Sequence, residues 1–302
     1  MKNPRADDYV TAMLRQHAVQ LGDHFKSDVL TIKSPIRFGL DDAIRHEVEN
    51  LQEPKKKRPD KLTAIVETTG GNIEVVERIY NVFRKHYKTV DFIVPNYAYS
   101  AGTILVLSGD EIYMDYYSVV GPIDPQYDSD NGKFMPGLGY LQKFNELVAT
   151  VNAAKNADSV RAQLAYLLKK FDPATLFFLE QAKSHSESLL EDWLPKHKLK
   201  DWKKRATSGK TVTPAYKRQR AKAIAKILGD AERWHSHGRG IGIRELTSDE
   251  IKLQVVNFGD DAALNAKIRP YYDLFTDYCG KLGAGGYNAV VLHSRNGLRR
   301  LA

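Results

Sequence analysis

Ser100 is the residue of this sequence whose type and setting most favour covalent chemistry. It lies in Ala98-Tyr99-Ser100-Ala101-Gly102, between a short strand that ends at Pro95 and an apolar stretch that suits a helix. A tight strand-to-helix turn projects a serine hydroxyl outward, and the N–H groups at the helix start can bind an oxyanion. The pattern resembles the nucleophile elbow G-x-S-x-G, with Ala98 in place of the first glycine. The alternative is a serine that only caps and packs the helix.

A glycine pair upstream strengthens the nucleophile hypothesis. Gly70 and Gly71 come after Thr68-Thr69 at the end of the apolar run Leu62–Glu67, about 30 residues before Ser100. Glycines in such a place let backbone N–H groups point into a cleft, as an oxyanion hole requires. A plain turn is the competing interpretation.

Three motifs in this order resemble one protease superfamily. They are Thr68-Thr69-Gly70-Gly71, Ser100-Ala101-Gly102-Thr103, and Ser118-Val119-Val120-Gly121-Pro122-Ile123-Asp124-Pro125-Gln126. Together they resemble the Clp protease and signal peptide peptidase A superfamily. The Gly-Pro-Ile-Asp-Pro-Gln stretch is similar to the serine dehydrogenase proteinase family in particular. The resemblance covers about 62–126, with a weaker match around His237.

The resemblance implies a ClpP/crotonase-like α/β fold of stacked β-β-α units, with a mostly parallel sheet and additional helices. It implies that Ser100 is the nucleophile and that the amides of Gly70 and Ala101 form the oxyanion hole. Its order of Ser, Asp and His is available as Ser100, Asp124 and His237. His237 would then take the serine proton, and a carboxylate would hold its tautomer.

Each partner of the serine has a structural alternative. Asp124 lies between Pro122 and Pro125, where it would equally cap a rigid turn. His237 lies in a glycine-rich turn, where a histidine often bonds only to backbone, and His235 would substitute for it as base.

A Ser–Lys dyad is the second chemistry that the resemblance implies. Signal peptide peptidases pair the serine with a lysine some 40 to 55 residues later, whose desolvated amine is the base. Lys143 and Lys155 lie at that spacing from Ser100. In a dyad, His237 would be structural.

Alternating strands and helices must position these residues. Leu62–Glu67, Val90–Val94 and Glu111–Val120 are predicted strands, separated by helices around 76–87 and 100–107. Such alternation is typical of a parallel α/β sheet, whose ligands bind beyond the carboxyl ends of the strands. The Gly70-Gly71 and Ser100 turns occupy such ends, so we expect them to lie close together.

The remaining chain is predicted to form three parts around this sheet. Residues 1–55 form an extension with helices over 8–25 and 41–51 and a strand at 29–32. Residues 140–230 form a helical, basic insertion or arm, with Leu147, Val151, Leu164, Leu167 and Phe171 facing its core and the basic segment continuing as helix to Leu228. Residues 56–139 and 231–302 form the protease-like core, the latter with a strand at 253–256, a helix over 260–282 and a final strand at 287–293.

Positive charge concentrates in one stretch of the chain. The chain holds 45 Lys and Arg against 37 Asp and Glu, a net charge of +8. Residues 196–226 carry twelve Lys or Arg against Asp201 alone, a net charge of +11. This basic segment would attract nucleic acid or an acidic partner, or it is a solvated helical face. Its Ser208-Gly209-Lys210-Thr211 lacks the earlier glycine of a phosphate-binding loop, because Lys204 stands there.

Composition narrows the classes of protein. With 302 residues, 42% hydrophobic and 27% charged, the chain suits one large domain or two modest ones, and disorder throughout is excluded. One cysteine, Cys279, permits no intrachain disulfide and no cysteine-based zinc site. We find no apolar run long enough to span a membrane, and the N-terminus has no secretory pattern. The expected location is therefore the cytoplasm.

The prediction is a serine peptidase that acts through an acyl-enzyme at Ser100, without metal or organic cofactor. Its partners would be peptide or protein substrates, and the resemblance implies a homo-oligomer that encloses the site. The competing hypothesis is a catalytically silent scaffold or adaptor that binds nucleic acid or an acidic partner through 196–226.

Overall fold

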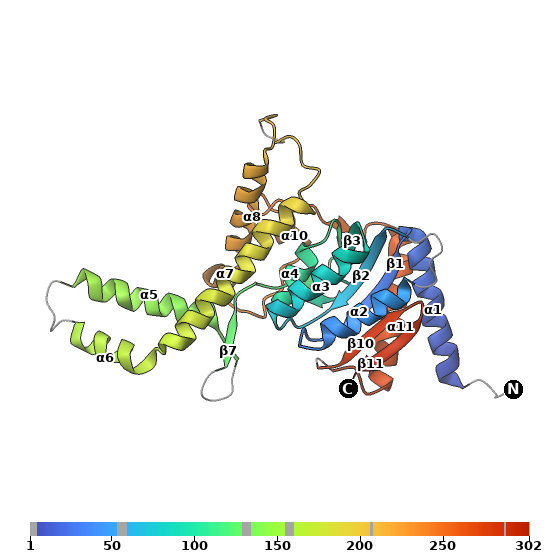
Figure 1. The fold of residues 1–302 in the computed structure, drawn as a ribbon, viewed down its shortest axis with the longest axis horizontal. Helices are drawn as coiled ribbons and strands as arrows, with labels where there is room; N and C mark the ends of the chain where they lie inside the picture. The colour runs from blue at the N-terminus through green and yellow to red at the C-terminus, as the bar shows by residue number, and fades with distance from the viewer. Residues whose placement is uncertain are drawn as a thin grey trace.

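A seven-stranded, mostly parallel sheet forms the centre of the molecule (Figure 1). The computed structural model describes residues 5–52, 59–128, 134–154, 160–205, 208–286 and 288–301. The sheet order is β11-β10-β1-β2-β3-β5-β9. In this sheet β1, β2, β3, β5 and β9 run parallel to one another. Strand β10 is antiparallel to both of its neighbours, β1 and β11. The strands are β1 (Asp28–Lys33), β2 (Lys61–Glu67), β3 (Thr89–Ile93), β5 (Ile112–Met114), β9 (Val256–Asn257), β10 (Val290–Ser294) and β11 (Gly297–Leu301).

The central strands are buried on both faces, as a parallel sheet covered by helices requires. Every residue of β1 is buried, and so are all of β2 except Lys61 and all of β3 except Thr89. Helices α2 (Leu40–Leu51) and α3 (Ile73–His86) pack together over one face, whereas α1 (Ala6–Phe25) and α11 (Ala262–Lys281) cover the other. The mixed α/β class and the mostly parallel sheet expected from the sequence are confirmed.

Two small separate sheets and further helices follow the central sheet. The short strands β4 (Tyr97–Ala98) and β6 (Val119–Val120) pair in parallel, and β7 (Gln126–Asp128) pairs antiparallel with β8 (Phe134–Pro136). The other helices are α4 (Ala101–Leu107), α5 (Gly137–Ala153), α6 (Arg161–Lys170), α7 (Pro173–Lys196), α8 (Pro214–Leu228), α9 (Ala231–Trp234) and α10 (Ile243–Thr247).

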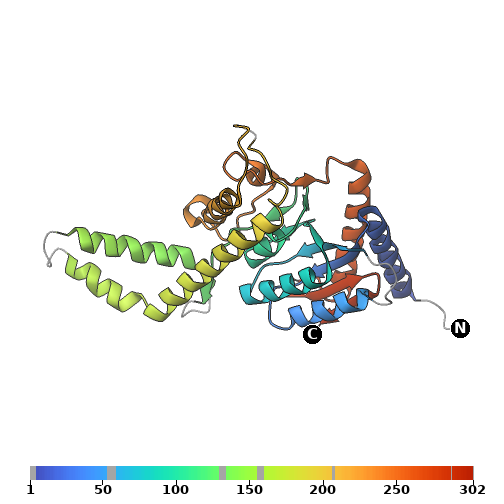
Figure 2. The ribbon, with the colours of Figure 1, turned by 45° about the horizontal axis from the view of Figure 1, so that its top comes forward.

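Helices α5, α6 and the first half of α7 form an arm that projects from the body (Figures 1 and 2). The second half of α7 packs on α8, and its Trp193 stacks on Tyr80 of α3 with ring centroids 4.1 Å apart. The prediction that Leu147, Val151, Leu164, Leu167 and Phe171 face a core was wrong, because none of them is buried. An isolated arm has too few layers to bury an apolar face by itself.

The structure corrects the placement of one predicted strand and the bounds of several others. The strand in residues 1–55 is no extension, because β1 lies between β2 and β10 inside the sheet. The single strand expected over 111–120 is divided into β5 and β6 by a turn, in which the Asp115 carboxylate accepts hydrogen bonds from the N–H groups of Tyr117 and Ser118. The strand expected at 253–256 shares only Val256 with β9, the strand expected at 287–293 begins three residues later as β10, and β11 was not predicted.

The basic segment is also not one helix. Helix α7 ends at Lys196 and α8 begins at Pro214, after the N-cap residue Thr213. Between them, Lys204 and Thr211 form an antiparallel bridge, and Gly209 takes the left-handed conformation with φ of 64°. A glycine turn and a proline at a helix start interrupt the helix here.

Acid is expected to weaken the fold through His293 of β10. This side chain is 1% exposed, and burial lowers its pKa to about 4 from an ordinary 6.5. The unfolded chain therefore takes up this proton first as the pH falls, so stability decreases between about pH 6.5 and 4. From pH 7 to 5 the contribution is roughly 2 kcal/mol.

Urea unfolding of the wild type and of His293→Gln at both pH values measures this contribution. The variant should lose less stability on acidification than the wild type. An equal loss in both proteins would contradict the assignment.

Candidate active site

Ser100 forms the turn between β4 and α4 in a strained backbone conformation. Its φ is 52° and its ψ is −120°, a combination that residues other than glycine rarely adopt. Such a conformation costs about 1–3 kcal/mol and persists only where surrounding structure holds it. A nucleophile elbow shows this kind of strain, because the sharp turn exposes the serine hydroxyl.

Gly70 lies directly against the Ser100 turn. A Cβ atom at Gly70 would stand 2.8 Å from the Ser100 Cβ and 2.6 Å from the Tyr99 carbonyl oxygen, so no side chain fits. Gly71 instead packs on the backbone of Ile36, where its own Cβ would stand 2.0 Å from the carbonyl oxygen. Of the glycine pair, Gly70 therefore approaches the serine, and the two turns expected to lie close together do so.

Two backbone N–H groups lie at this point, as an oxyanion hole requires. Ala101 is the first residue of α4, so its N–H has no acceptor within the helix. The Gly70 N–H donates to the hydroxyl of Thr68 at 3.1 Å. An oxyanion bound at Gly70 would have to share this N–H group with the Thr68 hydroxyl or displace the hydroxyl from it. The sequence did not indicate this competing acceptor, although Thr68 stands in the first motif.

Asp124 and His237 form a hydrogen bond although 113 residues separate them. The His237 Nδ1 lies 2.6 Å from an Asp124 carboxylate oxygen, and the two side chains are 14% and 3% exposed. An isolated antiparallel bridge between Val120 and Ile241 holds the two segments together, four residues from each member of the pair. The structure therefore brings together the predicted acid and base.

The Asp124–His237 pair and the Ser100 turn lie at one edge of the same small sheet. Strand β4, which precedes Ser100, pairs in parallel with β6, which precedes Gly121. A Cβ at Gly121 would stand 3.2 Å from the Ser100 nitrogen. Within the part of the chain that the structure describes, no hydrogen bond joins Ser100 to His237. Catalytic hydrogen bonds are often long before substrate binds.

Thr103 joins the two halves of the site and was not predicted to do so. Its buried hydroxyl lies 2.9 Å from the Ala98 carbonyl oxygen and 2.8 Å from that of Gly121, and it accepts from the Gly121 N–H at 2.9 Å. The sequence indicated this role only by placing a threonine three residues after the serine in an otherwise apolar helix.

The alternative bases lie in different surroundings. His235 is exposed and has a left-handed backbone with φ of 60°. Lys143 has a side chain that is 64% exposed and pairs with Glu146 at 3.0 Å. This pairing lowers the pKa of Glu146. Lys155 lies outside the described residues. A Ser–Lys dyad requires a desolvated lysine, and the exposed Lys143 is therefore not suited to it.

No group of three or more His, Cys, Asp or Glu side chains in the part of the chain that the structure describes is arranged to hold a metal ion. Likewise, none of the helices within the described ranges has the length and apolarity to cross a bilayer.

Comparison with known families identifies the segment that carries the serine. Residues 43–144 match the model of the ClpP-like SDH-type serine proteinases, which confirms the resemblance seen in the sequence and supports a serine peptidase.

Two curated relatives come from Methanocaldococcus jannaschii, and both are uncharacterized proteins. One is 30% identical over 157 residues, which are 52% of this chain and 48% of the relative. The other is 31% identical over 114 residues, which are 35% of this chain and 37% of the relative. The chain therefore spans about half the length of the first relative and less of the second.

Two solved structures of the 1510-N membrane-bound stomatin-specific protease align with part of the chain. One is a lysine-to-alanine variant in complex with a substrate peptide, at a TM-score of 0.32 and 20% identity over 39% of this chain and 57% of that one. The other is a serine-to-alanine variant, at a TM-score of 0.32 and 18% identity over 45% of this chain and 67% of that one.

Proposed function

From the match of residues 43–144 to the ClpP-like serine proteinases, we propose that this protein hydrolyses peptide bonds through an acyl-enzyme at Ser100. The observation that carries the proposal is the hydrogen bond between Asp124 and His237 beside a strained serine turn. A histidine oriented by a buried carboxylate is the general base that a serine nucleophile needs.

The proposed reaction has two halves. In the first, the Ser100 Oγ attacks the scissile carbonyl carbon while His237 Nε2 takes its proton, and the Nδ1–H donates to Asp124. The oxyanion accepts hydrogen bonds from the Gly70 and Ala101 N–H groups. Collapse of the intermediate breaks the C–N bond, and His237 returns the proton to the leaving amine. In the second half, His237 deprotonates a water that attacks the acyl ester and frees Ser100.

A fluorophosphonate probe tests this proposal, because it reacts with an activated serine and not with an ordinary one. We expect the purified protein to be labelled, with the label on the peptide that contains Ser100 when the digest is examined by mass spectrometry. A folded sample that stays unlabelled and cleaves neither casein nor a fluorogenic peptide library would favour the silent scaffold instead.

Replacement of Lys143 distinguishes a Ser–His–Asp triad from a Ser–Lys dyad. Because the Lys143 amine is exposed and paired with Glu146, Lys143→Ala should change kcat/KM by less than about twofold. Steady-state peptide hydrolysis measures this effect, with Lys169→Ala on α6 as a matched surface control. A loss of a hundredfold or more in the Lys143 variant alone would move the base to that lysine.

We also propose that the protein acts as a homo-oligomer in the cytoplasm. The single, buried Cys279 fits a reducing compartment. The arm exposes large apolar side chains, which are rarely left exposed together on a monomer. They are Leu164, Tyr166 and Leu168 of α6 and Phe177 and Phe178 of α7, between 40% and 86% exposed.

Charge on the arm should dissociate such an oligomer. In Leu168→Glu/Phe177→Glu, two carboxylates replace side chains that are 86% and 64% exposed, so the fold of one chain should be unaffected. Light scattering coupled to gel filtration should show a lower mass than for the wild type or for Gln181→Glu, an exposed control on α7. A wild type of monomeric mass, or an unchanged mass in the variant, would contradict the assignment of the arm.

A further inference from the structure

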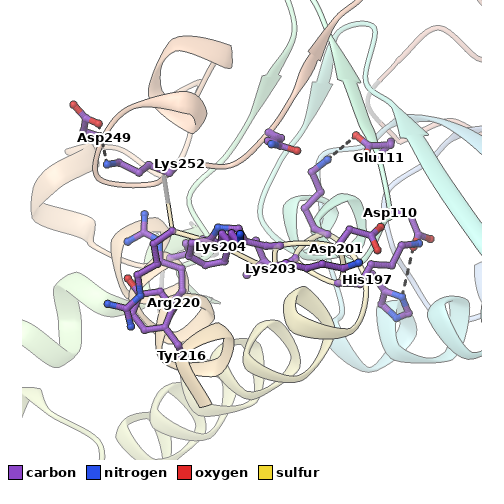
Figure 3. Close-up of a pocket in the computed structure, with 17 residues that line it drawn as sticks. Asp110, Glu111, His197, Asp201, Lys203, Lys204, Tyr216, Arg220, Asp249 and Lys252 are labelled. Carbon is purple, nitrogen blue, oxygen red and sulfur yellow. Dashed lines mark hydrogen bonds and ion pairs between the residues drawn. The ribbon is translucent and has the colours of Figure 1, made fainter. Parts of the chain in front are cut away.

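The basic segment borders a cavity of about 620 Å³ that shares no lining residue with the site around Ser100. The cavity lies between the 197–205 stretch, α8, the turn at 249–254 and the start of β5 (Figure 3). A cavity of this size is in the range that encloses a small molecule.

The cavity has an excess of positive charge. Seven Lys or Arg line it against four acidic residues, and three of these four acids are already paired. Asp110 binds Arg84 and Lys200, Glu111 binds Lys198, and Asp249 binds Lys252.

The other four cations of the lining form no ion pair with an acidic side chain of the described residues. Within the described residues, no acidic side chain pairs with Lys203, Lys204 or Arg205, and Arg220 donates to the Glu250 carbonyl oxygen. In Figure 3, Lys203 and Lys204 lie between Asp249 and Lys252 on one side and Asp110 and Glu111 on the other. Close, uncompensated cations favour a ligand that carries several negative charges.

Aromatic rings lie beside these cations. The Trp202 and Tyr216 ring centroids are 5.5 Å apart, and the Arg205 guanidinium lies 3.5 Å above the Tyr216 ring. Leu199 and Ile224 also border the cavity, but both side chains are buried in the core. Aromatic rings beside cations suit a ligand with a planar ring and an anionic group.

We propose that this cavity binds a phosphorylated small molecule with a planar ring, such as a nucleotide, at a site separate from Ser100. Lys203, Lys204 and Arg220 would contact the phosphates, while the ring would lie near Trp202 and Tyr216. A nucleic-acid strand fits less well, because it needs a long groove with successive stacking platforms. Among the described residues, this cavity has only one pair of aromatic residues in its lining, Trp202 and Tyr216, which contact each other.

Calorimetric titration of the full chain with ATP, inorganic triphosphate and adenosine tests this site. We expect ATP to bind with a Kd below about 1 mM, tighter than triphosphate and much tighter than adenosine. Lys203→Gln/Lys204→Gln should weaken ATP binding at least tenfold, since both side chains are exposed and their loss leaves the fold intact. Lys222→Gln/Lys226→Gln on α8, outside the cavity, removes the same charge and should change the Kd less than twofold.

Three results would overturn the proposal. One is no binding of ATP at 1 mM in low salt, and another is ATP binding no tighter than triphosphate, which would remove the role of the ring. The third is a single-stranded oligonucleotide or an acidic peptide that binds far tighter than ATP and is weakened equally by both double variants. That result would assign the segment to a polymer surface. None of these measurements depends on peptidase activity.

Discussion

Ser100→Ala should reduce peptide hydrolysis by about 10⁴–10⁶-fold in kcat, with little change in KM, because the acyl-enzyme can no longer form. Binding of the peptide depends on the cleft and not on the Oγ atom, so the effect should be confined to the chemical steps. Fluorophosphonate labelling should disappear in the same variant. Ser108→Ala, at the other end of α4, is the matched control and should keep activity within a few fold.

The strained backbone at Ser100 can be tested separately, by comparing the stability of two inactive variants. Alanine retains the unfavourable φ of 52°, whereas glycine adopts it without a Cβ penalty. Ser100→Gly should therefore be as inactive as Ser100→Ala but more stable than it, by roughly 1 kcal/mol in urea unfolding. Inactive variants of equal stability would mean that the turn is not strained, and a variant that keeps wild-type hydrolysis would exclude Ser100 as the nucleophile.

Loss of the Asp124–His237 pair should have the second largest effect. His237→Ala removes the base and should lower kcat by about 10⁴–10⁶-fold, and Asp124→Asn should lower it by about 10³–10⁴-fold because an amide favours the wrong tautomer. The double variant should be no worse than His237→Ala, since residues that act as one unit are not additive. Stopped assays with a fluorogenic peptide measure all three.

His235→Ala is the control for this pair, because His235 is exposed and two residues away. It should retain activity within about twofold. Since Asp124 is almost fully buried, circular dichroism and unfolding of Asp124→Asn must show an intact fold before its activity is compared. Full activity in folded His237→Ala would leave the histidine structural, and full loss in His235→Ala would make that residue the base.

The sequence by itself determined the elements whose patterns are local. Val90–Val94 and Leu62–Glu67 were identified as strands because each is a short apolar run closed by a turn, and β3 and β2 lie there. The helix that includes Val76, Ile79 and Phe83 was equally clear from its 3.6-residue period, and all three are buried. The Ser100 turn was found from its place between a strand and a helix.

Tertiary structure decided what depends on distant partners. Strand β1 pairs with β2 and with β10, some 30 and 260 residues later, and no local pattern shows that it lies inside the sheet. The hydrogen bond of Asp124 to His237 joins two segments that are distant in sequence and that also meet at the Val120–Ile241 bridge. The cavity beside Lys203 depends on how α8 packs. Periodicity records only which face of an element is buried. The partner that covers this face is selected by the free energy of the whole packed chain.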